Sequence, residues 1–217
     1  MTGAPSLAPP PGEVAARVFA DRLPFALHYA ELLAGDAVKW GLMGPRELPR
    51  LWDRHLVNSA LVTELLPPRV HVVDVGSGAG LPGLALVCRR VDLSVDLIES
   101  MQRRVDFLQR CIDALGISDV ARVTHGRAES PLVRAEVGLN KWVTARAVAP
   151  LGQLASWCLP LLQADGRLLA LKGAQAEAEV REHRQAILAL GGEIEDVVRC
   201  GAKTGADATT VVVVRRR

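Results

Sequence analysis

The sequence predicts an α/β protein with a seven-stranded, mostly parallel sheet, helices on both faces, and a helical extension before it. Three observations predict this class. From Arg69 onward, short β-rich runs alternate with helical segments, which is typical of a parallel sheet covered on both sides. The last two β-rich runs have no helix between them and therefore predict an antiparallel hairpin at one edge. A glycine-rich turn follows the first run, where such sheets bind ligands.

The chain begins with a proline-rich stretch that has few bulky apolar residues, and we expect residues 1–12 to be a disordered tail. Residues 13–68 form the predicted helical extension. Its helices are expected at Glu13–Asp21, at Pro24–Leu33, and at Glu47–Leu66, where apolar residues recur at spacings of three and four. Pro24 suits the first turn of a helix, and Pro67 with Pro68 marks the end of the third one.

Residues 69–217 are expected to form the sheet domain. The predicted strands are Val70–Val75, Ser94–Ile98, Ala121–His125, Trp142–Ala145, Arg167–Leu171, Glu193–Cys200 and Thr209–Arg215. The predicted helices are Pro82–Arg90, Gln102–Leu115, Leu151–Leu162 and Ala174–Leu190. Seven strands ending in a hairpin distinguish this sheet from a dinucleotide-binding domain with six parallel strands.

Composition narrows the class of protein. The chain has 217 residues, 49% of them hydrophobic, and a net charge of +2, so its charge neither indicates nor excludes a polyanionic partner. It shows no signal-peptide pattern and no apolar run long enough to cross a membrane. Its four cysteines are widely separated, which fits reduced thiols and no metal site. We therefore expect a cytoplasmic protein that neither associates with a membrane nor binds a metal ion.

The stretch "VVDVGSGAGLPG", residues 72–83, has two possible readings. Read from Gly78 as G-x-G-x-x-G, it matches the dinucleotide fingerprint, in which a helix N-terminus binds a pyrophosphate. Read from Asp74 as D-x-G-x-G-x-G, it matches the acidic loop of methyltransferases that use S-adenosylmethionine. A glycine-rich turn that serves only tight packing is the third interpretation.

Three observations favour the second reading. The residue that should open a dinucleotide fingerprint is Gly76, and the residue five positions later is Leu81 rather than glycine. Asp74 would repel a diphosphate, whereas it suits a ligand with an ammonium and a sulfonium group. Glu99 ends the second strand 23 residues after Gly76, where a carboxylate can accept hydrogen bonds from ribose hydroxyls. Glu99 supports a nucleoside ligand without choosing between the two cofactors.

Five motifs in one order resemble a particular family. They are "LWDRHLVNS" (51–59), "DVGSGAGLPG" (74–83), "IESMQRRVDFL" (98–108), "TARAVAPL" (144–151) and "LLALKG" (168–173). The chain is similar to the glucose-inhibited division protein B family over about residues 13–214. It departs from the family in its long proline-rich N-terminus and in an insertion around Pro131–Leu139.

The resemblance implies a Rossmann-like class I methyltransferase fold and an S-adenosylmethionine-binding domain over residues 69–217. It also implies transfer of a methyl group from S-adenosylmethionine to N7 of a guanine in the 530 loop of 16S ribosomal RNA. The implied partner is that RNA, in the 30S subunit or its precursor, and the implied enzyme is a cytoplasmic monomer. Loss of the modification would perturb the streptomycin-binding region.

The resemblance also implies site residues. Gly76 and Leu81 would line the methionine and ribose end of the cofactor, Ala128 and Glu129 would border the adenine, and Arg146 would contact the cofactor. Physical reasoning from the sequence adds three residues to the cofactor site. They are Asp74, Gly78 and Glu99.

The candidate catalytic residues are Arg146, Lys172 and His55. Lys172 ends the fifth strand, at the edge where ligands bind, and we assign it to RNA or transition-state contact; a strand-end cation without a role is the alternative. His55 falls on the apolar stripe of the third helix, where a packing role is the competing interpretation, although the resemblance places it in a segment that closes over the cofactor.

The expected chemistry needs no general base, because guanine N7 exposes a lone pair and loses no proton on methylation. The sequence has neither an Asn-Pro-Pro-Tyr type motif for exocyclic amines nor a Pro-Cys nucleophile for pyrimidine C5 after the fourth strand. Two other functions stay open from the sequence. They are a methyltransferase for a small molecule or protein, and an NAD-dependent oxidoreductase that uses the first glycine reading.

Overall fold

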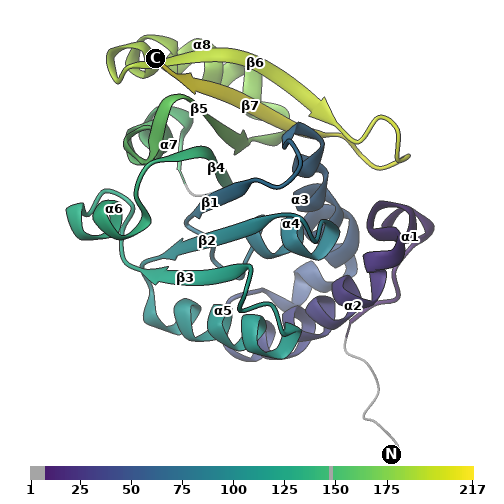
Figure 1. Cartoon of the computed structure of the whole chain (residues 1–217). Helices are drawn as coiled ribbons and strands as arrows, with labels where there is room; N and C mark the ends of the chain where they lie inside the picture. The colour runs from purple at the N-terminus through teal and green to yellow at the C-terminus, as the bar shows by residue number, and fades with distance from the viewer. Residues whose placement is uncertain (1–7, 147–148) are drawn as a thin grey trace, which may run out of the picture.

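The computed structural model describes residues 8–146 and 149–217, and its centre is one seven-stranded sheet, drawn in Figure 1. The strand order is β3-β2-β1-β4-β5-β7-β6. The strands are β1 His71–Val75, β2 Ser94–Glu99, β3 Ala121–His125, β4 Asn140–Arg146, β5 Leu162–Leu171, β6 Gly192–Cys200 and β7 Thr209–Arg216. The order places β1 between β2 and β4, so the chain reverses its direction of travel across the sheet there.

The pairing directions confirm the predicted sheet. β1 pairs in parallel with β2 and β4, β2 with β3, and β4 with β5. β7 pairs antiparallel with both β5 and β6, which forms the predicted terminal hairpin. Because the five parallel strands run the same way, their carboxyl ends meet at a single edge of the sheet.

Helices cover both faces of the sheet (Figure 1). The α-helices are α1 Glu13–Phe19, α2 Leu23–Leu32, α3 Asn58–Ala60, α4 Gly83–Arg89, α5 Gln102–Leu115, α6 Pro131–Val137, α7 Leu151–Cys158 and α8 Ala176–Ala189. Alternate residues of the strands point to opposite faces, so Val211 and Val213 join one hydrophobic cluster while Val212 and Val214 join the other. α2, α4 and α5 pack on the first cluster, and α6, α7 and α8 pack on the second.

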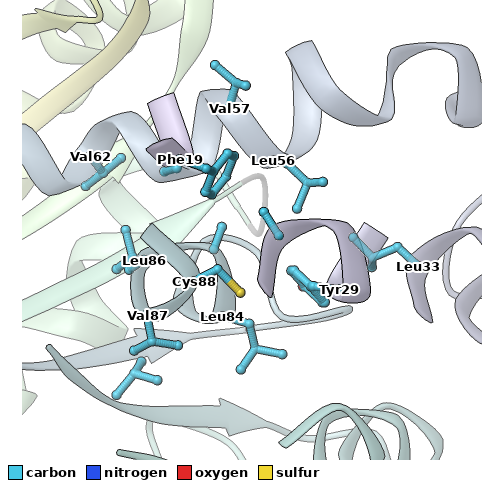
Figure 2. Packing of buried hydrophobic residues seen from close by; sticks show 14 of the residues in the cluster. Phe19, Tyr29, Leu33, Leu56, Val57, Val62, Leu84, Leu86, Val87 and Cys88 are labelled. Carbon is cyan, nitrogen blue, oxygen red and sulfur yellow. The ribbon is translucent and has the colours of Figure 1, made fainter. Parts of the chain in front are cut away.

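The helical extension shares the first cluster with the sheet, as Figure 2 shows from close by. Phe19 of α1 and Tyr29 of α2 lie beside Leu84, Leu86 and other residues of α4. Phe19 also makes an edge-to-face ring contact with Trp52, with ring centroids 6.2 Å apart. The extension therefore buries its apolar side chains against α4 and the sheet.

The predicted third helix, Glu47–Leu66, is a chain of short segments of different winding. A 3₁₀ segment, Pro45–Arg50, leads into a π-helical segment, Leu51–Val57, then into α3, and ends in a 3₁₀ segment, Leu61–Leu65. Pro49 lies inside the first segment, where it lacks the N–H that an α-helix needs. π-helical turns are frequent at functional sites, and this one carries His55.

Two further boundaries differ from the prediction. The insertion around Pro131–Leu139 forms α6, with Pro131 in its first turn. The strand expected from Arg167 begins earlier, at Leu162, because Leu162 pairs with Asn140 at the start of β4, and the pairing resumes after an irregularity at Trp142 and Arg167. Of the expected tail, residues 1–7 lie outside the described residues, while the carbonyl of Pro9 accepts a hydrogen bond from Trp52 Nε1.

No helix among the described residues combines the length and the apolar character that a bilayer crossing requires. Cys88, Cys111, Cys158 and Cys200 are all buried and form no disulfide. Burial raises the pKa of the Cys200 thiol to about 11. Its thiol is therefore protonated at neutral pH and unreactive.

Candidate active site

The glycine-rich loop after β1 lies at the carboxyl edge of the sheet and has left-handed backbone angles. Gly76, Gly78 and Gly80 have φ of 69°, 58° and 95°. A Cβ atom on Gly80 would lie 2.6 Å from the Tyr29 hydroxyl, whereas one on Gly78 would meet nothing closer than a backbone oxygen at 3.9 Å. Gly80 is therefore needed for packing, and Gly78 faces open space in a cleft.

Asp74 lies beneath this loop rather than in the cleft. Its carboxylate is fully buried and accepts hydrogen bonds from the Gly83 N–H at 3.1 Å and from the Thr144 hydroxyl at 3.0 Å. Burial raises the pKa of Asp74 to about 6. The predicted direct contact between Asp74 and a bound ligand has no counterpart in this position, because the side chain joins β1 to β4 and to the start of α4.

Glu99 ends β2 and lines the cleft, as expected from the sequence. One of its oxygens accepts from the Gly78 N–H at 2.9 Å, and the other accepts from the N–H groups of Ser100 and Met101. Arg104 lies 3.6 Å away. A carboxylate has about four acceptor positions, so Glu99 both fixes the loop and retains capacity for a ligand hydroxyl.

The cleft has a volume of about 530 Å³, within the usual range of about 300–1,000 Å³ for ligand sites. Gly76, Gly78, Leu81 and Glu99 form one wall. The opposite wall comes from the extension, and it consists of Leu42, Met43, Gly44, Glu47 and His55. A smaller hollow of about 110 Å³ adjoins it at Gly76 and Ser100 and contains Ala128 and Glu129. The structure thus brings the predicted cofactor residues other than Asp74 to one continuous surface.

Arg146, at the end of β4, is tied to the π-helical segment. Its Nη1 donates to the Ser59 hydroxyl at 2.6 Å and to the His55 carbonyl at 3.2 Å, and its Nη2 donates to His55 Nδ1 at 3.0 Å. The other ring nitrogen of His55 lies 2.8 Å from a carboxylate oxygen of Glu47. His55 is therefore the neutral tautomer with its proton on Nε2, because Nδ1 must supply a lone pair to Arg146.

Burial lowers the pKa of His55, with the nearby Arg146 charge acting in the same direction and Glu47 opposing both. Burial also lowers the pKa of the Arg146 guanidinium. The pKa of Glu47 is lowered because its carboxylate accepts the hydrogen bond from His55. All three side chains line the cleft.

A second cavity, of about 780 Å³, lies on the other side of Arg146, at the ends of β4 and β5 and against α8. Arg146 lines both cavities. Lys172 lines the larger one, but its ammonium is occupied: it donates to the Ala149 carbonyl at 2.6 Å and lies 2.9 Å from Glu179. Glu179 also accepts from the Leu151 N–H, so Lys172 helps to fix the start of α7.

Sequence reasoning missed Tyr29, Glu47 and Ser59. Tyr29 is the only tyrosine and lies on an apolar helix, yet its hydroxyl donates to the Ala79 carbonyl in the glycine loop at 2.6 Å. Ser59 follows the "WDRH" stretch and carried no signal of its own. Glu47 is eight residues from His55, a spacing that brings the two together only because the intervening segment changes its winding.

A family model described as rRNA small subunit methyltransferase G (GidB) matches residues 23–208. The chain belongs to this family. A curated member, "Ribosomal RNA small subunit methyltransferase G" of Mycobacterium sp. (strain JLS), is 50% identical over 97% of this chain and 92% of the relative. The protein of the same name from Salinispora arenicola (strain CNS-205) is 49% identical over 100% of this chain and 91% of its own length. The GidB resemblance inferred from the five motifs is confirmed.

Solved structures of methyltransferases share the fold. The mitomycin 7-O-methyltransferase MmcR superposes with a TM-score of 0.57 at 14% identity, over 95% of this chain and 76% of the other. Fibrillarin from Aeropyrum pernix, solved with natively bound S-adenosyl-L-methionine, superposes with a TM-score of 0.52 at 15% identity, over 74% of each chain. At these identities the likeness establishes the fold of this GidB protein and confirms the predicted fold class.

Proposed function

We propose that this GidB protein transfers a methyl group from S-adenosylmethionine to N7 of a guanine in the 530 loop of 16S ribosomal RNA. The family membership over nearly the whole chain carries the proposal. The substrate is the RNA within the 30S subunit or its precursor, and the enzyme acts as a cytoplasmic monomer. The cleft beside the glycine loop supports the choice of donor, since its walls fit a nucleoside joined to an amino acid.

Specific residues fit each part of the donor. Glu99, which lines the cleft and keeps one acceptor position, would accept from a ribose hydroxyl. The smaller hollow at Ala128 and Glu129 suits the adenine ring. Gly76 lines both spaces and Leu81 lines the cleft, which suits the methionine and ribose end of the donor. Gly78 lets the backbone come close, because no side chain stands between its Cα atom and the cleft. Asp74 supports the loop from below.

Arg146 has donors left for the amino-acid carboxylate. A guanidinium has five N–H groups, and three of them bind His55 and Ser59. Within residues 8–146 and 149–217, the remaining two have no acceptor, while the side chain lines the cleft. Arg146 is thus a candidate for direct contact with the donor, and His55, Ser59 and Glu47 are positioning residues that hold it in place.

When bound, S-adenosylmethionine supplies a methyl group attached to a positively charged sulfur. This sulfur needs no further activation to act as the leaving atom. The chain's own contribution is orientation and exclusion of water. The guanine N7 lone pair forms the new N–C bond, the C–S electron pair stays on sulfur, and no proton moves. The neutral His55 fits this scheme, because no base is required and an uncharged ring adds no repulsion near the methyl group.

Lys172 fits a supporting role better than direct contact. Its ammonium already has a carbonyl and a carboxylate partner, and its side chain is only 6% exposed. We propose that Lys172 shapes the larger cavity by anchoring Glu179 and the segment before α7. Replacing Lys172 by a neutral residue would remove its contacts with both Ala149 and Glu179.

The function is tested by incubating the protein with S-adenosylmethionine carrying a labelled methyl group and 30S subunits from cells that lack this protein. Mass spectrometry of digested 16S RNA should find the label in one 7-methylguanosine of the 530 loop. Label on an exocyclic amine, or on small molecules but never on 30S subunits, would contradict the proposal. Calorimetry provides the control, with binding of S-adenosylmethionine and no binding of NAD expected.

A further inference from the structure

The larger cavity has the features of a binding site for a flat polar ring. Its volume of about 780 Å³ lies within the range of ligand sites. It meets the donor cleft at Arg146, the one side chain that appears in the walls of both among the described residues. A ring bound there can present an atom to the donor across this boundary, while the rest of the ring contacts the cavity wall.

The wall beside Arg146 contains Asn58, the first residue of α3. Asn58 is half-buried, and its carbonyl accepts from the Thr209 hydroxyl at 2.9 Å, which holds the residue against β7. Its side-chain amide has no hydrogen-bond partner in the described part of the chain. A carboxamide offers a donor and an acceptor side by side, and its neighbour Ser59 is already fixed by Arg146.

A guanine has the complementary edge. Its O6 and N1–H form a lactam, which presents an acceptor beside a donor, and this edge lies on the far side of O6 from N7. A ring that turns N7 toward the donor cleft therefore turns its lactam edge deeper into the cavity. Bases in RNA loops are commonly splayed out and read on this edge.

Resting on the proposed function, we propose that the cavity beyond Arg146 holds the flipped-out target guanine and that Asn58 reads its lactam edge. The Asn58 amide N–H donates to O6, and its Oδ1 accepts from N1–H. Arg54, which also lines the cavity, supplies positive charge suited to the attached phosphates, whereas Lys172 in the same wall is paired with Glu179. Asn58 is then a specificity residue for the acceptor, with no part in holding the donor.

The test compares four proteins by single-turnover methylation of 30S subunits and by calorimetry with S-adenosylmethionine. Asn58→Leu removes both hydrogen bonds and should slow methylation about 10- to 100-fold, the usual effect of losing a paired base contact. Asn58→Asp keeps the acceptor for N1–H and adds one for the exocyclic amine, so it should stay within about fivefold of wild type. Gln153→Leu, an exposed amide on α7 that lines neither cavity, is the matched control and should behave as wild type.

Each result either supports or overturns the role of Asn58. Equal rates for Asn58→Leu and Gln153→Leu would overturn the role of Asn58, and so would an Asn58→Asp protein as slow as Asn58→Leu. If Asn58→Leu also lost donor binding, Asn58→Ala would replace it, with the same slowing expected at normal donor affinity; weakened donor binding there too would overturn the assignment to the acceptor. A wild-type protein that binds the donor but never methylates 30S subunits would instead overturn the proposed function.

Discussion

Asp74 shows how a residue can be recognised in the sequence as part of a site and still lie outside the residues that line the cleft. Its place at the end of a β-rich run before a glycine turn identified it as part of the site. The structure turns its side chain inward, to Thr144 and Gly83, because the strand alternates its side chains between the two faces. Glu99, at the end of the next strand, lines the cleft as predicted.

Asp74 should make stability depend on pH. Its pKa is about 6 in the folded protein, against an ordinary value of 3.8, so its contribution is fully present below the unfolded pKa and is lost as the pH rises through 6. In urea unfolding at pH 4 and pH 7, the wild type should lose about 2 kcal/mol relative to Asp74→Asn over this interval. An unchanged difference between the two proteins would show that Asp74 ionises normally.

His55 should act through Arg146. His55→Leu removes the acceptor at Nδ1 and should lower kcat/KM about 10- to 100-fold, since a hydrogen bond to a charged group contributes about 1.5–3 kcal/mol. His55→Asn places an oxygen near the position of Nδ1 and should recover most of the rate. Protonation of His55 at Nδ1 breaks the same contact. Because burial lowers the pKa of His55 from its ordinary value of 6.5, wild-type activity should fall only at a pH below 6.5. An acid limb that persists in His55→Asn would argue against this role.

At the scale of elements, α2 and the π-helical segment position the site from outside the sheet. The periodicity of the sequence predicted helices in both places but could not predict the change in winding from Pro45 to Leu65. Within this stretch, Trp52 contacts Phe19 and His55 contacts Glu47. Helix α6 was missed because its stretch was interpreted as an insertion. Apart from the start of β5, strands were predicted to within a few residues, because their β-branched runs are distinct.

Helix α2 should contribute to donor affinity through Tyr29. Tyr29→Phe removes the hydrogen bond to Ala79 and frees the glycine loop, so the Kd for S-adenosylmethionine should rise about fivefold, the equivalent of about 1 kcal/mol. Thr63→Val is the matched control, because it removes another buried hydroxyl bonded to a carbonyl, that of Ala60, away from the cleft. Calorimetry that finds equal affinities for the two variants would contradict the role of Tyr29.

An ion-pair cluster away from the cleft links β1, β2 and β3 and serves the stability of the sheet. Asp96 of β2 is buried, forms an ion pair with Arg122 of β3, and lies 3.4 Å from His71 of β1. Asp96→Ala should lower the free energy of unfolding by about 2–3 kcal/mol. Asp119→Ala, at an exposed residue that lines the same small surface hollow as Asp96, should change it little. Methylation by folded Asp96→Ala protein should equal that of wild type. A selective loss of activity would show that this edge takes part in the reaction.

At the scale of the whole molecule, the donor cleft exists because the helical extension and the sheet meet. Residues 13–68 provide one wall through Met43, Glu47 and His55, and the loops after β1 and β2 provide the other. We propose that the sequence division at residue 68 separates a covering element from the donor-binding domain, although both share one hydrophobic cluster. The sequence could predict the second wall from its glycines, but the first wall depends on contacts between distant segments.

A crystal structure of the protein with S-adenosylhomocysteine tests the central claim most directly. We expect the ribose against Glu99, the adenine beside Ala128 and Glu129, and the amino-acid carboxylate near Arg146, with the cavity around Asn58 left free for the base. A ligand bound elsewhere, with the cleft filled by side chains of the extension, would contradict this account.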